Sequence, residues 1–391
     1  MMKSFTLFTD EIDDTQYAVE QITQQLQQSG PLLKNTIGII SCYADFIQTD
    51  TYQAICAALD FEIIGTTTIL STTPDSDADI LLSIMVLTSD DVSFATGLSA
   101  PIEKEDTSLV TAAYQDAAAK LDCAPSLILS FAPLLMNVSG DFFATALDEI
   151  SGGVPNFGTL AVDHTENYQQ SRVLYNGGAY TDQYAFVLLS GNVHPRYYVA
   201  SISNEKVFQE KGVVTASSGN QLQTVNNMPV ADYLVGLGMK KEENGSITGI
   251  NSFPFLMDQN DGMMPIVRVM FAITPEGYAV CGGDIPVGAT LSVGSIDAGQ
   301  VIATTQDSIS QVIANGNYDC LLMYSCVGRY FALGYNPEAE VEKVRSLLND
   351  TGISYHFAYS GCEICPVYSN DTTLGNTINR SHNDTLVICT L

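Results

Sequence analysis

The sequence predicts an α/β protein whose sheets are built from an internally repeated unit. At 391 residues the chain is longer than one ordinary core supports. Apolar residues make up 46% of it and are spread along the whole length, so each part can bury a core. The order helix, strand, helix, strand, strand occurs three times. We therefore expect two mixed-sheet domains with flanking helices.

The first copy of the unit shows the pattern most fully. Tyr17, Val19, Ile22 and Leu26 recur at helical spacing after acidic capping candidates, which predicts a helix over residues 13–29. The elements expected after it are a strand at 36–43, a helix at 51–59, and strands at 61–66 and 78–87.

The second and third copies keep the same order. In the second copy we expect a helix at 108–121, a strand at 126–132, a helix at 140–150, and strands at 157–162 and 183–189. In the third copy the corresponding elements are a helix at 297–315, a strand at 319–326, a helix at 338–348, and strands at 353–360 and 384–390.

A stretch of different character, residues 193–295, separates the second and third copies. Its pattern predicts strands at 197–202 and 213–224, a helix at 228–237, and a hairpin at 266–280 that turns at 275–277. We place the domain boundary at its start, which gives domains 1–192 and 193–391.

Charge limits the partners that this surface can bind. The chain has 15 Lys and Arg against 44 Asp and Glu, a formal charge of −29. Such a surface repels phosphate backbones and anionic lipids, so neither nucleic acid nor a membrane is an expected partner. The N-terminus lacks a secretory signal pattern, and an odd number of scattered cysteines, nine, fits a reducing compartment. A cytoplasmic location follows as the expectation.

Small and polar residues follow the apolar strands of all three copies. The first strands read IGIISCY, LILSFAP and LLMYSCV, and the later corners read IIGTTT, NFGTLAVD and AYSGCEI. Ligands of α/β proteins gather outside the carboxyl ends of strands. A ligand site is therefore expected where these corners meet.

Four of these segments resemble the FIST family. They are CVGR at 326–329, YSGCEICP at 359–366, NNMPVA at 226–231 and FGTLAVD at 157–163. Cys362 departs from the family pattern, which usually has glycine directly before the Glu-Ile pair. The resemblance implies an intracellular sensory module of two parts that binds small ligands such as amino acids, and some members bind haem to sense nitric oxide. Because the resemblance spans nearly the whole chain, we expect the signal to pass to a separate protein.

The expected pocket lies between the corners at 326–329 and 360–363. Arg329 is a candidate for holding a ligand carboxylate in two-point fashion, and its alternative role is an ion pair with Glu363 or another acid. Glu363 is a candidate for an ammonium group or for bonds to turn amides. The full set of candidate ligand-binding residues is Cys326, Arg329, Ser360, Cys362 and Glu363, with Asp163 and His164 from the other half.

Cys362 and Cys365 form a C-x-x-C, and Cys320 and Cys326 invite a zinc interpretation with them. The second pair brackets an apolar strand rather than a tight turn, so no metal site is expected. A redox dithiol is an equally weak alternative, because no nearby positive charge is evident to lower a thiol pKa.

Two other functions stay open at this point. A haem-based gas sensor would need an axial ligand, for which the histidines His164, His194, His356 and His382 are available. A cysteine hydrolase would need Cys326, His356 and Glu363 to come together. The sequence lacks a Gly-x-Ser-x-Gly, a His-Glu-x-x-His and a phosphate-binding glycine loop. We therefore expect a ligand-binding protein without a required cofactor rather than an enzyme, and the sequence leaves its oligomeric state open.

Overall fold

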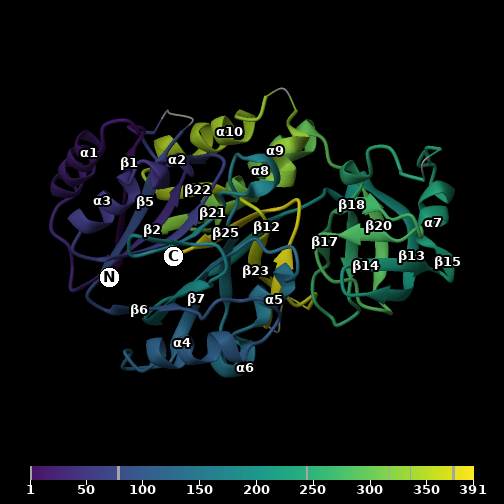
Figure 1. Ribbon diagram of the computed structural model, residues 1–391, viewed down its shortest axis with the longest axis horizontal. Coiled ribbons are helices and arrows are strands. Elements are labelled where there is room, and N and C mark those ends of the chain that lie inside the picture. The colour runs from purple at the N-terminus through teal and green to yellow at the C-terminus, as the bar shows by residue number, and fades with distance from the viewer. Residues whose placement is uncertain (1, 77–79, 244, 317, 335, 372–374) are drawn as a thin grey trace.

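A computed structural model describes residues 2–76, 80–243, 245–316, 318–334, 336–371 and 375–391. It shows an α/β body and a β-rich part, drawn in teal and green at the right of Figure 1. The body contains three mixed sheets with helices on their outer faces, which confirms the predicted mixed α/β class. Within the described residues, no helix is long and apolar enough to span a membrane.

The first unit of the body forms the sheet order β1-β5-β2-β3. Only β2 and β3 run parallel, because α3 carries the chain back between them, and the other neighbours are antiparallel. The elements are β1 (Met2–Thr9), α1 (Thr15–Gln28), β2 (Asn35–Cys42), α2 (Asp45–Gln48), α3 (Thr51–Ala58), β3 (Glu62–Thr67) and β5 (Leu82–Ser89).

The same strand order recurs in the second unit as β6-β11-β7-β8 and in the third as β12-β25-β21-β22. The directions also agree, since only the last two strands of each set are parallel. The second unit contains β6 (Val92–Leu98), α4 (Ser108–Ala118), β7 (Pro125–Ala132), α5 (Gly140–Thr145), α6 (Asp148–Ser151), β8 (Asn156–Leu160), η1 (Glu166–Tyr168) and β11 (Ala185–Gly191). The third contains β12 (Arg196–Ala200), α8 (Ala298–Asn315), β21 (Cys320–Cys326), α9 (Val327–Ala332), α10 (Ala339–Leu348), η4 (Asn349–Thr351), β22 (Ser354–Ser360) and β25 (Leu386–Thr390).

Each unit also adds a strand to the sheet of another unit. The first unit's β4 (Ser71–Thr72) pairs with β22 of the third. From the second unit, β9 (Val173–Tyr175) pairs with β3 of the first and carries β10 (Gly178–Tyr180). From the third unit, β23 (Glu363–Tyr368) pairs with β8 of the second and carries β24 (Thr377–His382). This cyclic exchange ties the three units together, and its strands come from both sides of the expected boundary at 192/193.

The β-rich part is inserted into the third unit, between β12 and α8. It has an antiparallel sheet in the order β17-β16-β20-β13-β14-β19-β18, with β15 on β14. Its elements are η2 (Asn204–Lys206), β13 (Val207–Ser218), β14 (Gln221–Val225), β15 (Met228–Pro229), α7 (Val230–Gly236), η3 (Ile250–Ser252), β16 (Phe255–Asp258), β17 (Ile266–Arg268), β18 (Met270–Ile273), β19 (Ala279–Cys281) and β20 (Thr290–Gly294). It packs a hydrophobic core of its own, to which the body adds Val367 and Ile378.

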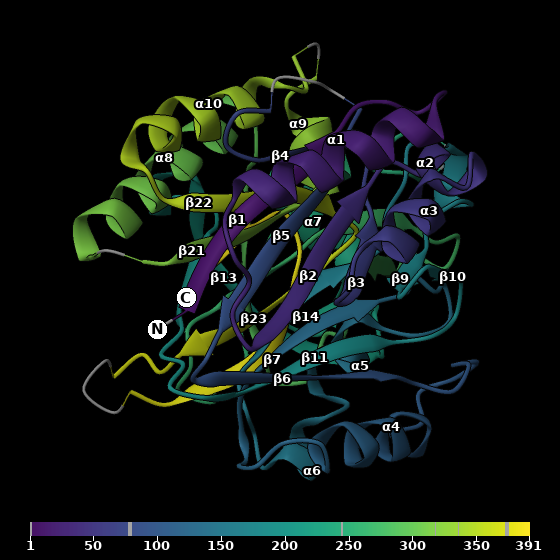
Figure 2. The same cartoon turned by 90° about the vertical axis from the view of Figure 1, so that its left-hand side faces the viewer.

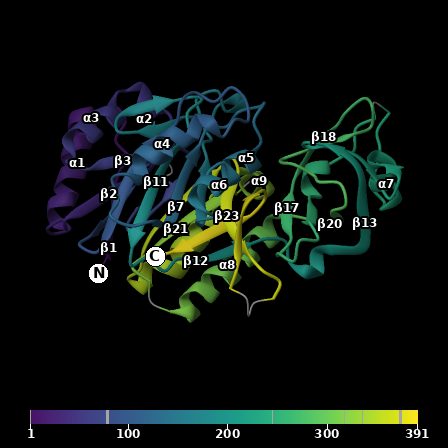
Figure 3. The same cartoon turned by 90° about the horizontal axis from the view of Figure 1, so that it is seen from below.

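The three sheets of the body face one another around a central core. Ile39, Leu129 and Leu322 represent the three sheets in this core. The outer faces pack against helices in three separate clusters, one for each unit. Figure 2 shows these helices on three sides of the sheets, and Figure 3 shows α4 lying across the sheet that contains β7 and β11.

Several elements differ from the expectation. The sequence analysis assigned no strand to β1, β6 or β23, and it joined β13 and β14 into one strand at 213–224. Gly219 breaks that strand because it adopts a φ of +55° at the turn. The helix expected at 140–150 is divided into α5 and α6. Of the strand expected at 78–87, residues 78 and 79 lie outside the described residues.

Candidate functional site

The exits of three parallel strands, one from each unit, are hydrogen-bonded to one another. After β3, the Thr68 hydroxyl donates to the Tyr359 carbonyl on β22 over 2.9 Å. After β22, the Gly361 N–H donates to the Leu160 carbonyl on β8 over 3.0 Å, and after β8 the Val162 N–H donates to the Thr67 carbonyl over 3.3 Å. These bonds bring the corners of the three units to one place.

Two of these strands carry a glycine because the parallel neighbour lies too close for a side chain. A Cβ at Gly65 would lie 1.8 Å from the Ile40 carbonyl oxygen, and one at Gly158 would lie 1.9 Å from that of Ser130. Both glycines face the strand that precedes them in their unit, β2 and β7. The glycines in IIGTTT and NFGTLAVD thus fix the close approach that positions the corners.

A pocket of about 370 Å³ opens where these corners meet, and we call it the exit pocket. Its lining comes from all three units, with residues that follow β2, β3 and β8 and residues of α9, the helix after β21. The lining residues are Tyr43, Ile69, Asp163, His164, Thr165, Glu166, Asn167, Tyr168, Tyr330 and Phe331.

Aromatic rings make up much of the exit pocket. The His164 ring stacks on Tyr43 with centroids 4.0 Å apart and planes 6° from parallel. Tyr330 meets Phe331 edge to face at 5.7 Å and meets Tyr359 in the same manner at 5.2 Å. Phe331 is 60% exposed. The pocket therefore presents fixed aromatic surfaces together with one aromatic ring that is open to solvent.

Asp163 holds the loop that forms one side of the exit pocket. Its carboxyl is buried and accepts the N–H of Thr165 over 2.6 Å and the N–H of Gln170 over 3.0 Å. Between them, Asn167 and Tyr168 both have positive φ, at +55° and +54°, a conformation that costs free energy for residues other than glycine. The two hydrogen bonds hold this strained loop in place.

Arg329 forms a buried ion pair, the kind of contact that was given as its alternative role. Its guanidinium donates to Glu340 Oε1 from Nε over 3.0 Å and from Nη2 over 2.7 Å. Further donations go to Thr304, Thr305 and the Val301 carbonyl. Arg329 is 1% exposed and Glu340 is fully buried. The guanidinium is therefore occupied by its own protein, with Glu340 in place of the expected Glu363.

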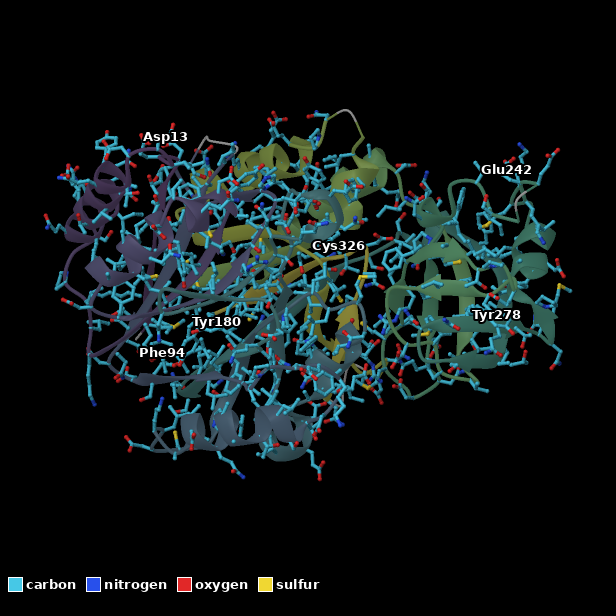
Figure 4. All side chains as sticks on the ribbon, viewed as in Figure 1. Asp13, Phe94, Tyr180, Glu242, Tyr278 and Cys326 are labelled. Carbon is cyan, nitrogen blue, oxygen red and sulfur yellow. The ribbon has the colours of Figure 1, made fainter. Side chains whose placement is uncertain are left out.

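Three buried acidic groups, Cys326, Glu363 and Asp384, lie together near α9, and we call them the inner acid cluster. Burial raises the pKa of each, to about 7 for Asp384 and well above the usual range for Cys326 and Glu363. Thr385 donates to Glu363 Oε2 over 2.9 Å, while Glu363 Oε1 and Asp384 Oδ2 have no hydrogen-bond partner among the residues that the structure describes. Figure 4 labels Cys326 in the body, toward the side that faces the β-rich part. The cluster therefore contains buried carboxyl oxygens that make no hydrogen bond to any described residue.

The inner acid cluster is close to the exit pocket through Tyr168. Burial raises the pKa of Tyr168, and the nearby Cys326 and Asp163 raise it further. Of the candidate residues, Asp163 and His164 line the exit pocket, whereas Cys326, Ser360, Cys362 and Glu363 are buried and are not among its lining residues.

The C-x-x-C does not form a pair of reactive thiols. Cys362 packs in the hydrophobic cluster beneath α4 and α5, whereas Cys365 packs in the central core. Burial raises the pKa of Cys362 to about 12 and that of Cys365 well above the ordinary value. Among the described residues, no group of three or more His, Cys, Asp or Glu is arranged to hold a metal ion.

The nucleophilic set of Cys326, His356 and Glu363 does not assemble. In the pairing of β21 with β22, Cys326 lies opposite Ser360, and His356 lies opposite Leu322, four residues away. Four strand residues span about 13 Å, so His356 is out of reach of the Cys326 thiol. His356 bonds to the Ser83 hydroxyl over 3.0 Å instead, and burial lowers its pKa to about 4.

Sequence reasoning missed the aromatic lining of the exit pocket. Tyr43 directly follows the strand IGIISC, and Tyr330 and Phe331 follow LLMYSC by a few residues. An aromatic residue just beyond a strand end was the available signal. The candidates named from the sequence were instead cysteines, charged residues, Ser360 and His164, whose side chains suggest chemistry more directly.

The fold defines an α/β protein assembled from three units. The model of the FIST N domain matches residues 36–228 and that of the FIST C domain matches residues 230–366. The chain belongs to the FIST family, whose domains are associated with small-ligand sensing in signal transduction.

The comparisons with curated proteins and with solved structures give no further indication of function. No curated protein matches the sequence. Among solved structures, the crystal structure of cyanuric acid hydrolase from A. caulinodans is similar over 100% of this chain and 99% of that one. Its sequence identity is 8% and its TM-score is 0.34, a likeness that carries no inference for this chain.

Proposed function

We propose that this chain is a cytoplasmic sensory protein that binds a small ligand in the exit pocket and passes the signal to a separate protein. The observation that carries the proposal is the pocket itself, which all three units line at their strand exits. Ligands of α/β folds bind at such exits. A volume of about 370 Å³ suits a small molecule.

The composition of the exit pocket also supports a sensory role. Tyr43 and Ile69 belong to the first unit, Asp163 to Tyr168 to the second, and Tyr330 and Phe331 to the third. A ligand here contacts three separately packed layers. Its binding energy can therefore favour one arrangement of the units over another, which is how a ligand shifts a conformational equilibrium.

The remaining site predictions concern residues beneath the surface. Ligand contacts of Cys326, Ser360, Cys362 and Glu363 stay predictions, and all four side chains are buried. For Arg329 the ion pair with Glu340 supports a structural role.

A haem does not fit the exit pocket. His164 is the only histidine among the lining residues, and its ring is stacked on Tyr43. Haem propionates need cations, yet Asp163 and Glu166 are the charged residues of the lining. We therefore derive no gas-sensing step for this chain.

Mass spectrometry of small molecules that copurify with the native protein tests the proposal. The parent is compared with Phe331→Ala, which removes the exposed ring of the pocket, and with Phe271→Ala as a matched control. Phe271 lies in the β-rich part and is 62% exposed, close to the 60% of Phe331. We expect a compound that is present in the parent and in the control and is depleted in Phe331→Ala. Equal recovery from all three proteins would contradict a ligand site in the exit pocket.

The predicted signalling partner needs a second experiment. A protein that crosslinks to the chain in cytoplasmic extract, with a yield that the copurified compound changes in the parent but not in Phe331→Ala, supports the signalling role. A crosslinking yield that does not respond to the compound contradicts it.

A further inference from the structure

We propose that the exit pocket selects a small organic cation whose charged group is a quaternary or methylated ammonium. The inference rests on the proposed function, because it names the ligand class of the same pocket. Three features of the pocket lead to it: its aromatic faces, the sign of its charges, and the way its buried carboxyl is already used.

Among the described residues, five aromatic rings line the exit pocket. Tyr43, Tyr168, Tyr330 and Phe331 line the pocket, and the His164 ring adds a fifth aromatic surface. Tyr43 is supported by its stack with His164, and Tyr330 by its edge contact with Tyr359. The faces of such rings carry partial negative charge and attract cations, and clusters of them recognise quaternary and methylated ammonium groups.

The charges of the pocket have the sign that a cation requires. Asp163 and Glu166 line it, and Asp45 Oδ1 lies 3.8 Å from His164 Nε2. In the described part of the chain, no lysine or arginine lines the pocket. Arg329, two residues from Phe331, is neutralised by Glu340. The chain as a whole carries a formal charge of −29, so cations are drawn to this surface.

These charges disfavour an anionic ligand and weaken the expectation of an amino acid. An amino acid brings a carboxylate as well as an ammonium group, and its carboxylate needs a cation or a set of free N–H donors. The expected cation, Arg329, is buried and occupied. A carboxylate in the pocket would instead lie near Asp163 and Glu166.

The use of Asp163 favours a quaternary over a primary ammonium. A primary ammonium brings three N–H donors and binds best where a carboxylate is free to accept them. Asp163 is buried and each of its oxygens already accepts a backbone N–H. Its burial keeps these oxygens from direct contact with a ligand, so Asp163 contributes mainly negative charge. Glu166 is the exposed carboxylate of the lining, and water solvates it there. A quaternary ammonium has no N–H donors. It needs only the negative electrostatic potential of the carboxylates and contact with the faces of the aromatic rings.

Calorimetric titration of the full chain with three probes tests the ligand class. Choline is the quaternary cation, ethanolamine has the same charge on a primary ammonium, and 3,3-dimethylbutanol has the shape of choline without charge. We expect choline to bind at least about tenfold more tightly than either of the other two, which corresponds to 1.4 kcal/mol. Phe331→Leu, which keeps an apolar side chain but removes the ring, should weaken choline at least about fivefold. Phe271→Leu should leave it unchanged.

Each other outcome overturns the inference in a different way. Equal binding of ethanolamine would show that the acidic surface alone attracts the cation. Equal binding of dimethylbutanol, lost in Phe331→Leu, would leave the exit pocket as a ligand site and refute only the cationic class. Choline binding that is absent up to about 10 mM, or that Phe331→Leu does not change, also refutes the class. The proposed function fails separately, if no copurifying compound depends on Phe331.

Discussion

Arg329 and Phe331 are two residues apart in the same short helix, yet they belong to different environments. Arg329 is 1% exposed and paired with Glu340, whereas Phe331 is 60% exposed at the exit pocket. A helix turns about 100° per residue, so two positions separate the side chains by about 200°. The inner side of α9 is a polar network that holds the fold, and its outer side is a surface that a ligand can reach. The sequence pattern predicts a corner at residues 326–329 and did not predict α9, so the side of the helix on which each residue lies was not accessible from the pattern.

The largest expected effect is on the inner side. Arg329→Ala leaves the Glu340 carboxylate buried without its cation, so we expect a loss of about 3–5 kcal/mol in the free energy of unfolding. Urea denaturation followed by circular dichroism measures it. Pairing Arg329→Ala with Glu340→Gln should recover part of the loss, because no unpaired charge then stays buried. A stability equal to that of the parent would mean that Arg329 is available to a ligand after all.

A smaller effect is expected at the inner acid cluster, and it depends on pH. Burial raises the pKa of Asp384 from 3.8 to about 7 in the folded protein, so folding favours the protonated carboxyl. The stability that this group contributes is present below about pH 4 and is lost as the pH rises through 7. Asp384→Asn removes the ionisable carboxyl and with it the loss of stability at high pH. The free energy of unfolding of the variant at pH 8 should therefore exceed that of the parent by an amount on the order of 1–3 kcal/mol.

The measurement for Asp384→Asn is urea denaturation at pH 5 and at pH 8. The gain should shrink toward pH 5, and Asp307→Asn, on the exposed side of α8, is the control that should show no gain. A gain that is the same at both pH values would assign the effect to packing rather than to ionisation.

The smallest effect on stability is expected on the outer side of α9. Phe331→Ala removes a ring that is 60% exposed, and we expect a change within about 0.5 kcal/mol in the free energy of unfolding. Thermal melting of the variant beside the parent checks this. If Phe331→Ala destabilises the protein as strongly as Arg329→Ala does, the outer side of α9 also stabilises the fold, and the proposed difference between the two sides is wrong.

The order of helices and strands in each unit was largely accessible from the sequence because it depends on a pattern. Apolar strands and the corners after them recur, and the corners do meet at Asp163 and His164. The partner of Arg329 was not accessible, because Glu340 is one of 44 acidic residues and only packing selects it. Strand β23 was taken for part of a corner, since GCEICP contains glycine, proline and charge. Its strand character comes from pairing with β8 of another unit, a contact that no local pattern reports.

The cyclic exchange of strands also has a consequence for how the chain is made. The ribosome releases β8 roughly two hundred residues before β23, its partner in the sheet, so the edge of the second unit stays open during most of synthesis. Strand β4 is likewise synthesised long before β22, the strand with which it pairs. Exposed strand edges pair readily with other chains. We therefore expect the N-terminal half of this protein to expose these edges during translation until the last strands are made.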